Sequence, residues 1–166
     1  MFLQNLRARL GARLSGDSEA GFTLIELLVV MLILGILAAI ALPAFFNQRE
    51  KAGDSKAKEN AHSAQVAVET YATENSGSYK EVTLAKLHKI EPTISETPGV
   101  VATKTEGIIV AELGGGTGYE IQSVSSTGND FKIKNEAGTM SFLCTTPGTG
   151  ACPEKETGKT EGNWSK

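Results

Sequence analysis

The sequence has few of the residues that catalysis, metal binding and nucleic-acid binding need. Its 166 residues carry a net charge of −3, and no long basic run follows the first fifteen residues. Electrostatic attraction to nucleic acid is therefore not expected, and no direct nucleic-acid site is visible. The two histidines, His62 and His88, stand apart without a nucleophile partner, which excludes a Ser–His–Asp arrangement. Two cysteines are too few for a closed zinc site.

Phosphate-binding and calcium-binding patterns are missing as well. The run GGGTG at residues 114–118 lacks the Lys-Ser/Thr pair and the helix that follow in a phosphate loop, so it predicts a flexible turn. Four carboxylates are scattered without Asp-x-Asp spacing, which leaves a calcium site open but unsupported: Glu112, Glu120, Asp130 and Glu136. We predict no catalytic residue, no cofactor and no metal site.

What the sequence does contain is one long apolar run. Residues 22–46 are almost wholly apolar, with no charge between Glu26 and Arg49, whereas the rest of the chain is polar. Residues 27–46 would form ~30 Å of helix, which matches the core of a bilayer. A secretory signal is shorter, although residues 38–44 (AAIALPA) keep a cleaved signal open as an alternative. Three arginines precede the run and hold that side in the cytoplasm: Arg7, Arg9 and Arg13.

Glu26 is the one charged residue inside this run. Placing a carboxylate in a membrane helix costs about 2.5–3.5 kcal/mol, so it either lies shallow, with its head at the interface, or has a cationic partner. The sequence offers no cation between Arg13 and Arg49, but a cut after Gly21 would free the α-amine of Phe22. Opposite charges about 4 Å apart attract by ~4 kcal/mol at an effective dielectric of 20. The amine could meet its own Glu26 or that of a neighbour, and in the second case the pair would set the register between helices.

Residues 21–28, GFTLIELL, with the apolar run and Pro43 behind them, resemble the N-terminal signature of the type IV pilins. The type II secretion pseudopilins and the competence pseudopilins share this signature. The resemblance covers about residues 7–75.

The resemblance implies a role for five positions. A prepilin peptidase would cut between Gly21 and Phe22 and methylate the new amine of Phe22. Glu26 would neutralise the N-terminus of the adjoining subunit during assembly. The stretch between Gly35 and Pro43 would unwind when the subunit leaves the bilayer and enters the fibre.

The predicted fold class is α+β, with a long N-terminal helix clasped by an antiparallel sheet. The helix should run from Phe22 to near Asn75, where Asn-Ser-Gly stops it. One narrow stripe of its second half is apolar and mostly small, so that a sheet can approach it: Ala57, Ala61, Ala64, Val68 and Tyr71. The predicted domains are a removed leader (1–21), a transmembrane or filament-core helix (22–46) and a globular domain (47–166), which begins with the amphipathic half of the helix (47–75).

The globular domain should continue with a short helix or turn and then a meander. Val82, Leu84, Leu87 and Ile90 mark the short helix or turn, which Pro92 closes. Alternation and turn chemistry predict antiparallel strands within about residues 107–144, whose apolar face packs on the helix. The expected strands are 107–113, 118–124, 129–135 and 139–144. The tail, residues 153–166, is polar apart from Trp164 and is expected to lack ordered structure.

Cys144 and Cys152 bound a short loop rich in Gly and Thr. Such a pair in a chain with a membrane element predicts a disulfide in an oxidising compartment, while two reduced thiols remain the alternative. Closing this loop should stabilise the fold by about 2.5 kcal/mol in the chain-entropy model.

The function implied is that of a structural subunit, not an enzyme. The precursor would sit in the inner membrane as a single-pass protein and would then join a surface pilus used in adhesion, twitching motility or DNA uptake. Its expected partners are further copies of itself, minor pilins, the prepilin peptidase, and the inner-membrane assembly platform with its ATPase. The alternatives are a pseudopilin of a type II secretion or competence apparatus, and an uncleaved single-pass membrane protein with a binding domain.

Overall fold

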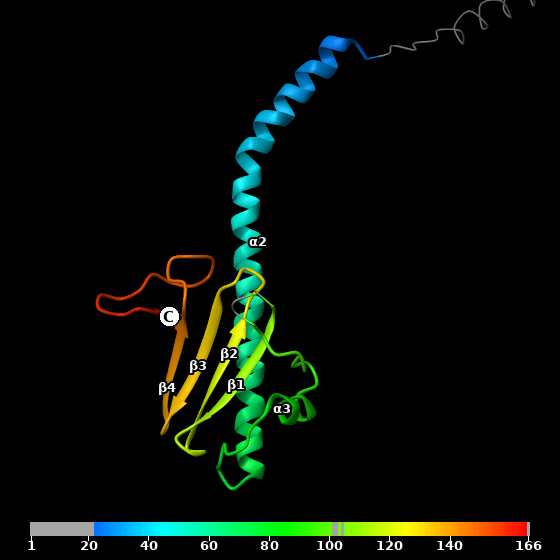
Figure 1. The fold of residues 1–166 in the computed structure, drawn as a ribbon. Helices are drawn as coiled ribbons and strands as arrows, with labels where there is room; N and C mark the ends of the chain where they lie inside the picture. The colour runs from blue at the N-terminus through cyan, green and yellow to red at the C-terminus, as the bar shows by residue number, and fades with distance from the viewer. Residues whose placement is uncertain (1–21, 101–102, 104, 166) are drawn as a thin grey trace, which may run out of the picture. The chain divides into compact units, whose positions relative to one another are not determined.

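The computed structural model describes residues 22–100, 103 and 105–165, and the chain divides between Leu42 and Pro43 into two compact units. The described part of the first unit is helical. Helix α2, Leu24–Glu74, begins there and continues into the second unit without interruption at Gly35 or Pro43 (Figure 1). This confirms the predicted long helix to within two residues at its start.

The first unit exposes its large apolar side chains. Every described residue up to Leu42 is exposed, and Leu24 and Ile40 keep 79% and 72% of their surface. The helix is long and apolar enough to cross a membrane by length and composition. Apolar surface of this extent requires lipid or neighbouring protein to cover it.

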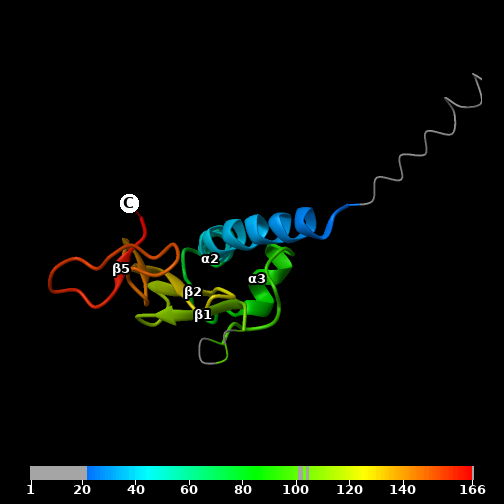
Figure 2. The ribbon, with the colours of Figure 1, turned by 90° about the horizontal axis from the view of Figure 1, so that it is seen from above.

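The second unit combines the rest of α2 with a short helix and a five-stranded sheet. Its elements are α3 (Leu84–Ile90), β1 (Gly107–Leu113), β2 (Gly118–Val124), β3 (Asp130–Glu136), β4 (Thr139–Cys144) and β5 (Gly162–Asn163). The strands are ordered β1-β2-β3-β4-β5, and every neighbouring pair is antiparallel (Figures 1 and 2). The predicted meander is therefore confirmed, with β3 shifted by one residue.

The core lies between α2 and one face of the sheet. All five members of the predicted helix stripe are buried, and the bulk of the core comes from the strands that face it. The large apolar and aromatic strand side chains with no exposed surface include Tyr119, Ile121, Phe131 and Ile133. Alternation along β2 and β3 placed these residues on one face, as the period of a strand requires.

The Glu69 carboxylate joins the helix to two tyrosines of this core. Its oxygens accept from the hydroxyls of Tyr79 and Tyr119, at 2.9 and 2.8 Å. The two rings meet edge to face, with centroids 4.9 Å apart. Burial, with a further contribution from Glu69, raises the pKa of both phenols, so both remain protonated donors.

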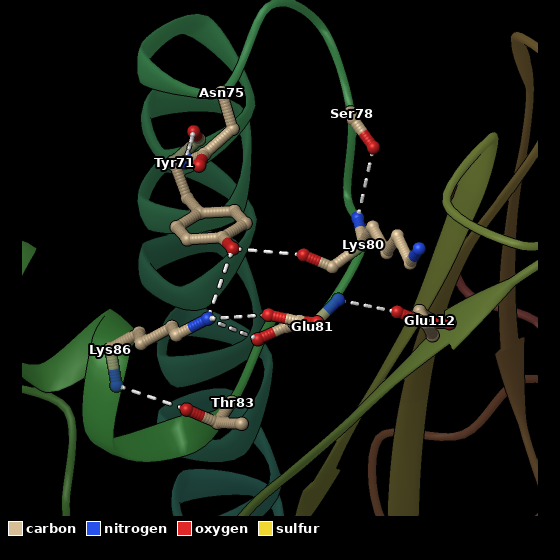
Figure 3. Close-up of polar contacts among 8 residues, drawn as sticks. All are labelled: Tyr71, Asn75, Ser78, Lys80, Glu81, Thr83, Lys86 and Glu112. Atoms are coloured by element: carbon tan, nitrogen blue, oxygen red, sulfur yellow. Dashed lines mark hydrogen bonds and ion pairs between the residues drawn. The ribbon is translucent and has the colours of Figure 1, made fainter.

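The end of α2 is fixed by left-handed residues and by side chains that fold back onto it. Ser76 and Gly77 have φ of 58° and 81°, which stops the helix at the predicted Asn-Ser-Gly. Figure 3 shows Tyr71, whose hydroxyl donates to Lys80 O at 2.8 Å and accepts from Lys86 Nζ at 3.2 Å. The predicted short helix is confirmed as α3.

The disulfide loop is held against the helix by a buried acid. Cys144 and Cys152 are bonded, with Cα atoms 5.8 Å apart. Asp54, which has no exposed surface, accepts at 2.8 Å from the backbone N–H of Ala151 inside the loop. Lys58 Nζ donates to Ala151 O at 2.7 Å, and its pKa is lowered by burial, against the attraction of Asp54. One turn of α2 therefore holds both backbone groups of Ala151.

The expectation of a tail without ordered structure was wrong. Strand β5 pairs with β4, and Trp164 is only 7% exposed. The indole Nε1 donates to Leu143 O at 2.8 Å, and its ring lies edge to face with those of Phe131 and Phe142. One aromatic side chain buries enough surface to order a polar segment. The average composition of residues 153–166 is polar and does not show the effect of this one residue.

Replacing Trp164 should therefore destabilise the sheet, and its effect should not be confined to the C-terminal segment. We expect Trp164→Ala to lower the free energy of opening β3 and β4 by about 3–5 kcal/mol, as for other buried tryptophans. Hydrogen exchange of the full chain in detergent micelles measures this through the amides of both strands. Ser165→Ala, at the exposed neighbouring residue, is the control. Unchanged exchange in the Trp164 variant would contradict this role.

Candidate functional site at the start of the long helix

The first turn of α2 is built around Thr23 and Glu26. Thr23 immediately precedes the helix, and its Oγ1 accepts from the backbone N–H of Glu26 at 3.2 Å. In return, Glu26 Oε2 accepts from the Thr23 backbone N–H at 2.8 Å and from the Thr23 hydroxyl at 2.7 Å. This is a capping box, which satisfies donors that a helix N-terminus otherwise leaves unpaired.

The capping box uses only one oxygen of the carboxylate. Both Thr23 donors converge on Oε2, and no residue in the described part of the chain donates to Oε1. Glu26 therefore has a fixed orientation and one oxygen open to a donor from outside the chain. A carboxylate at a helix N-terminus is also favoured by the helix dipole.

The other predicted site residues are placed as follows. Gly21 lies outside the described residues, so the predicted cut is not represented. Phe22 precedes the helix and is 87% exposed. Gly35 and Pro43 are both inside α2, and a Cβ added at Gly35 would meet nothing within 4 Å. The unwinding predicted between them concerns the fibre, and in the single chain this stretch is helical.

Two important residues were missed from the sequence, although each left a signal. The Thr-x-x-Glu spacing of Thr23 and Glu26 is that of a capping box. Asp54 falls three residues before Ala57, in line with the buried stripe. Its oxygens accept from Thr127 Oγ1 at 2.6 Å and Asn129 Nδ2 at 2.8 Å as well as from the disulfide loop. An acid in register with an apolar stripe is a candidate for a buried, fully bonded group.

No metal-binding group emerges among residues 22–100, 103 and 105–165. Nowhere in that part of the chain do three His, Cys, Asp or Glu side chains gather closely enough to hold an ion.

Comparison with known proteins places this start of the helix in a family. Residues 17–42 match the model of the prokaryotic N-terminal methylation motif. The chain is 33% identical over 84 residues to the type II secretion system core protein G of Pectobacterium carotovorum subsp. carotovorum, a match that spans 51% of the chain and about half, 54%, of that relative.

Two further relatives match over most of this chain, and both are type IV major pilins of Neisseria gonorrhoeae. One is 32% identical over 148 residues, 85% of this chain and 67% of the relative. The other is 34% identical over 137 residues, 80% of this chain and 73% of the relative. With the methylation motif, the long apolar helix and the antiparallel sheet packed on its second half, the chain belongs to the type IV pilin family.

Proposed function

We propose that this chain is the precursor of a structural subunit of a type IV pilus, polymerised into a surface filament after a cut between Gly21 and Phe22. The observation that carries the proposal is the state of Glu26. Its carboxylate stands at the start of an exposed apolar helix, within the methylation motif, with Oε2 held by Thr23 and Oε1 open.

The open oxygen of Glu26 suits a terminal amine. The cut creates an α-amine on Phe22, and N-methylation of Phe22 by the same peptidase preserves its positive charge. The amine of one subunit binds Glu26 of its neighbour, and an attraction of ~4 kcal/mol at about 4 Å offsets the cost of a carboxylate in an apolar bundle. Because only one alignment of two helices brings the pair together, the pair sets the register of the fibre.

The apolar helix supplies the bulk of the filament core in this proposal. Its exposed side chains bury against neighbouring helices at about 25 cal/mol per Å² of apolar area removed from water. Gly35 and Pro43 mark the stretch that unwinds on extraction from the bilayer, since proline removes a helical hydrogen bond and glycine is a poor helix former.

The globular unit is the outward-facing part. Its Cys144–Cys152 disulfide suits an oxidising compartment beyond the inner membrane. In this proposal the subunit assembles with its own copies and with minor pilins, driven by the inner-membrane platform and its ATPase. The fibre serves adhesion, twitching motility or DNA uptake, and the subunit has no catalytic role.

The second candidate is a pseudopilin of a type II secretion apparatus. The match to core protein G over half the chain favours it. Both candidates share the cut, the methylated amine and the Glu26 pair, and they differ in the length of the fibre. Long surface fibres seen by electron microscopy on cells that express this chain support the pilus.

Mass spectrometry of the N-terminal peptide, from protein sheared off the cell surface, tests the processing step. We expect an N-methylated Phe22 as the first residue. An intact Met1 would overturn the proposal in favour of an uncleaved membrane protein.

Removing the Glu26 carboxylate should weaken assembly while leaving processing intact. We expect Glu26→Ala to insert and to be cut after Gly21 as wild type does, yet to give a yield of sheared fibres lower by at least about tenfold, since the pair is worth ~4 kcal/mol. Glu59→Ala removes an exposed acid from the same helix and serves as the control. A wild-type fibre yield from the Glu26 variant would refute the register role.

Thr23 should tune the same step more weakly. Thr23→Val removes the hydroxyl that orients Glu26 but keeps the charge pair, and the lost cap costs about 0.5–2 kcal/mol. We expect a fibre yield between those of wild type and Glu26→Ala, with Thr23→Ser close to wild type because it restores the hydroxyl. A Thr23→Ser variant as weak as Thr23→Val would show that the hydroxyl is not the cause.

A further inference from the structure

A groove with unpaired charges lies on the second unit where the apolar run ends. It is lined by Phe46, Arg49, Glu50, Ser126 and Thr127 and encloses 340 Å³. One wall is α2 and the other is the turn between β2 and β3.

The turn approaches the helix closely at Gly53. A Cβ added at Gly53 would come within 2.8 Å of Ser126 Oγ. The turn is held there by Thr127, whose hydroxyl donates to the buried Asp54 at 2.6 Å. The groove is therefore a built feature of the fold, since its second wall is bonded to the helix.

The polar groups of the groove are largely free. Arg49, Glu50 and Ser126 form no hydrogen bond or ion pair through their side chains with any residue in the described ranges. Arg49 and Glu50 are exposed, and they place one cation and one anion side by side in the chain. Such a pair matches a ligand that itself carries both charges a short distance apart.

The place of the groove along the helix indicates where that ligand comes from. Phe46 is the last residue of the membrane-length run, and Arg49 follows about 4.5 Å further along the helix axis. The headgroup layer of a bilayer is roughly 5–7 Å thick on each side of the hydrocarbon core. With the run centred in a bilayer, Arg49 and Glu50 lie at the depth of the phosphates and Phe46 at the level of the aromatic belt.

We propose that this groove binds a phospholipid headgroup that carries a phosphate and a primary ammonium, as in phosphatidylethanolamine. Arg49 and the Ser126 hydroxyl bind the phosphate, Glu50 accepts from the ammonium, and Phe46 contacts the start of the acyl chains. Glu50 disfavours a purely anionic lipid because it lines the same groove. The headgroup seats the globular unit on the outer leaflet until the subunit is extracted. This inference rests on the proposed function, because it requires the membrane-inserted precursor.

The test uses the full chain in nanodiscs that contain equal parts of phosphatidylethanolamine, phosphatidylcholine and phosphatidylglycerol. Native mass spectrometry then counts the lipids retained on the released protein. We expect phosphatidylethanolamine to be retained about fivefold to tenfold over each of the other two, the effect of one charge-assisted hydrogen bond. The quaternary ammonium of phosphatidylcholine cannot donate to Glu50, and phosphatidylglycerol has no cation.

Two variants separate the contributions of the two charges. Arg49→Gln should lower the retention of all three lipids, since all three carry the phosphate. Glu50→Gln should abolish the preference for phosphatidylethanolamine over phosphatidylcholine and should raise the retention of phosphatidylglycerol. The matched controls are Lys51→Gln and Glu59→Gln, which remove one charge of each sign from exposed positions of the same helix outside the groove.

Several outcomes would overturn the inference. Equal retention of the three lipids by wild type is one, and Arg49 and Glu50 variants that match their controls are another. Hydrogen-exchange protection of residues 125–129 that rises with protein concentration, rather than with phosphatidylethanolamine, would assign the groove to a second copy of the chain. Insertion is measured separately by co-flotation with the lipid, so a chain that inserts without headgroup preference contradicts this inference alone.

Discussion

Close packing between a small-residue face of α2 and the sheet is the contact on which the globular unit depends. Ala61 and Ala64 are fully buried, and Ala57 keeps 3% of its surface. Their size allows the sheet to approach, so the volume of the core is supplied by aromatic and branched residues of the strands. Larger residues on the helix would force the two layers apart, because protein interiors are packed as densely as crystals.

Asp54 adds a polar contact to this packing and ties distant segments to one turn of the helix. It joins the β2–β3 turn through Thr127 and Asn129, and the disulfide loop through the N–H of Ala151. A buried carboxylate that accepts from three donors is costly to disturb, since the loss of any partner leaves a desolvated group. The wall of the groove beside Arg49 and the disulfide loop therefore share a single anchor.

Much of this fold was predictable because its signals are local. The apolar stripe of the helix has a period near 3.6, and the strand alternation at Tyr119, Ile121, Phe131 and Ile133 has a period of two. Asn75-Ser76-Gly77 is a common signal for the end of a helix. The methylation motif, which a family model matches over residues 17–42, is a local signal as well. The burial of Asp54 has a local signal in its register with the stripe, but its partners lie more than seventy residues away and the sequence around it does not identify them. The order of the tail depends in the same way on contacts of Trp164 with strands that composition does not reveal.

The position of Trp164 in the chain has a consequence for biosynthesis. Its ring contacts that of His62 on α2, with centroids 5.2 Å apart. The C-terminal segment of the domain therefore packs against the helix with which the domain begins. Because Trp164 follows the helix and the strands in the chain, synthesis completes α2 and the sheet strands it packs against before this indole. Until then Phe131 and Phe142 lack a covering partner, and contacts between such distant residues form slowly. Folding therefore includes an interval in which the aromatic side chains of β3 and β4 are exposed, and the domain closes only after Trp164 packs on them.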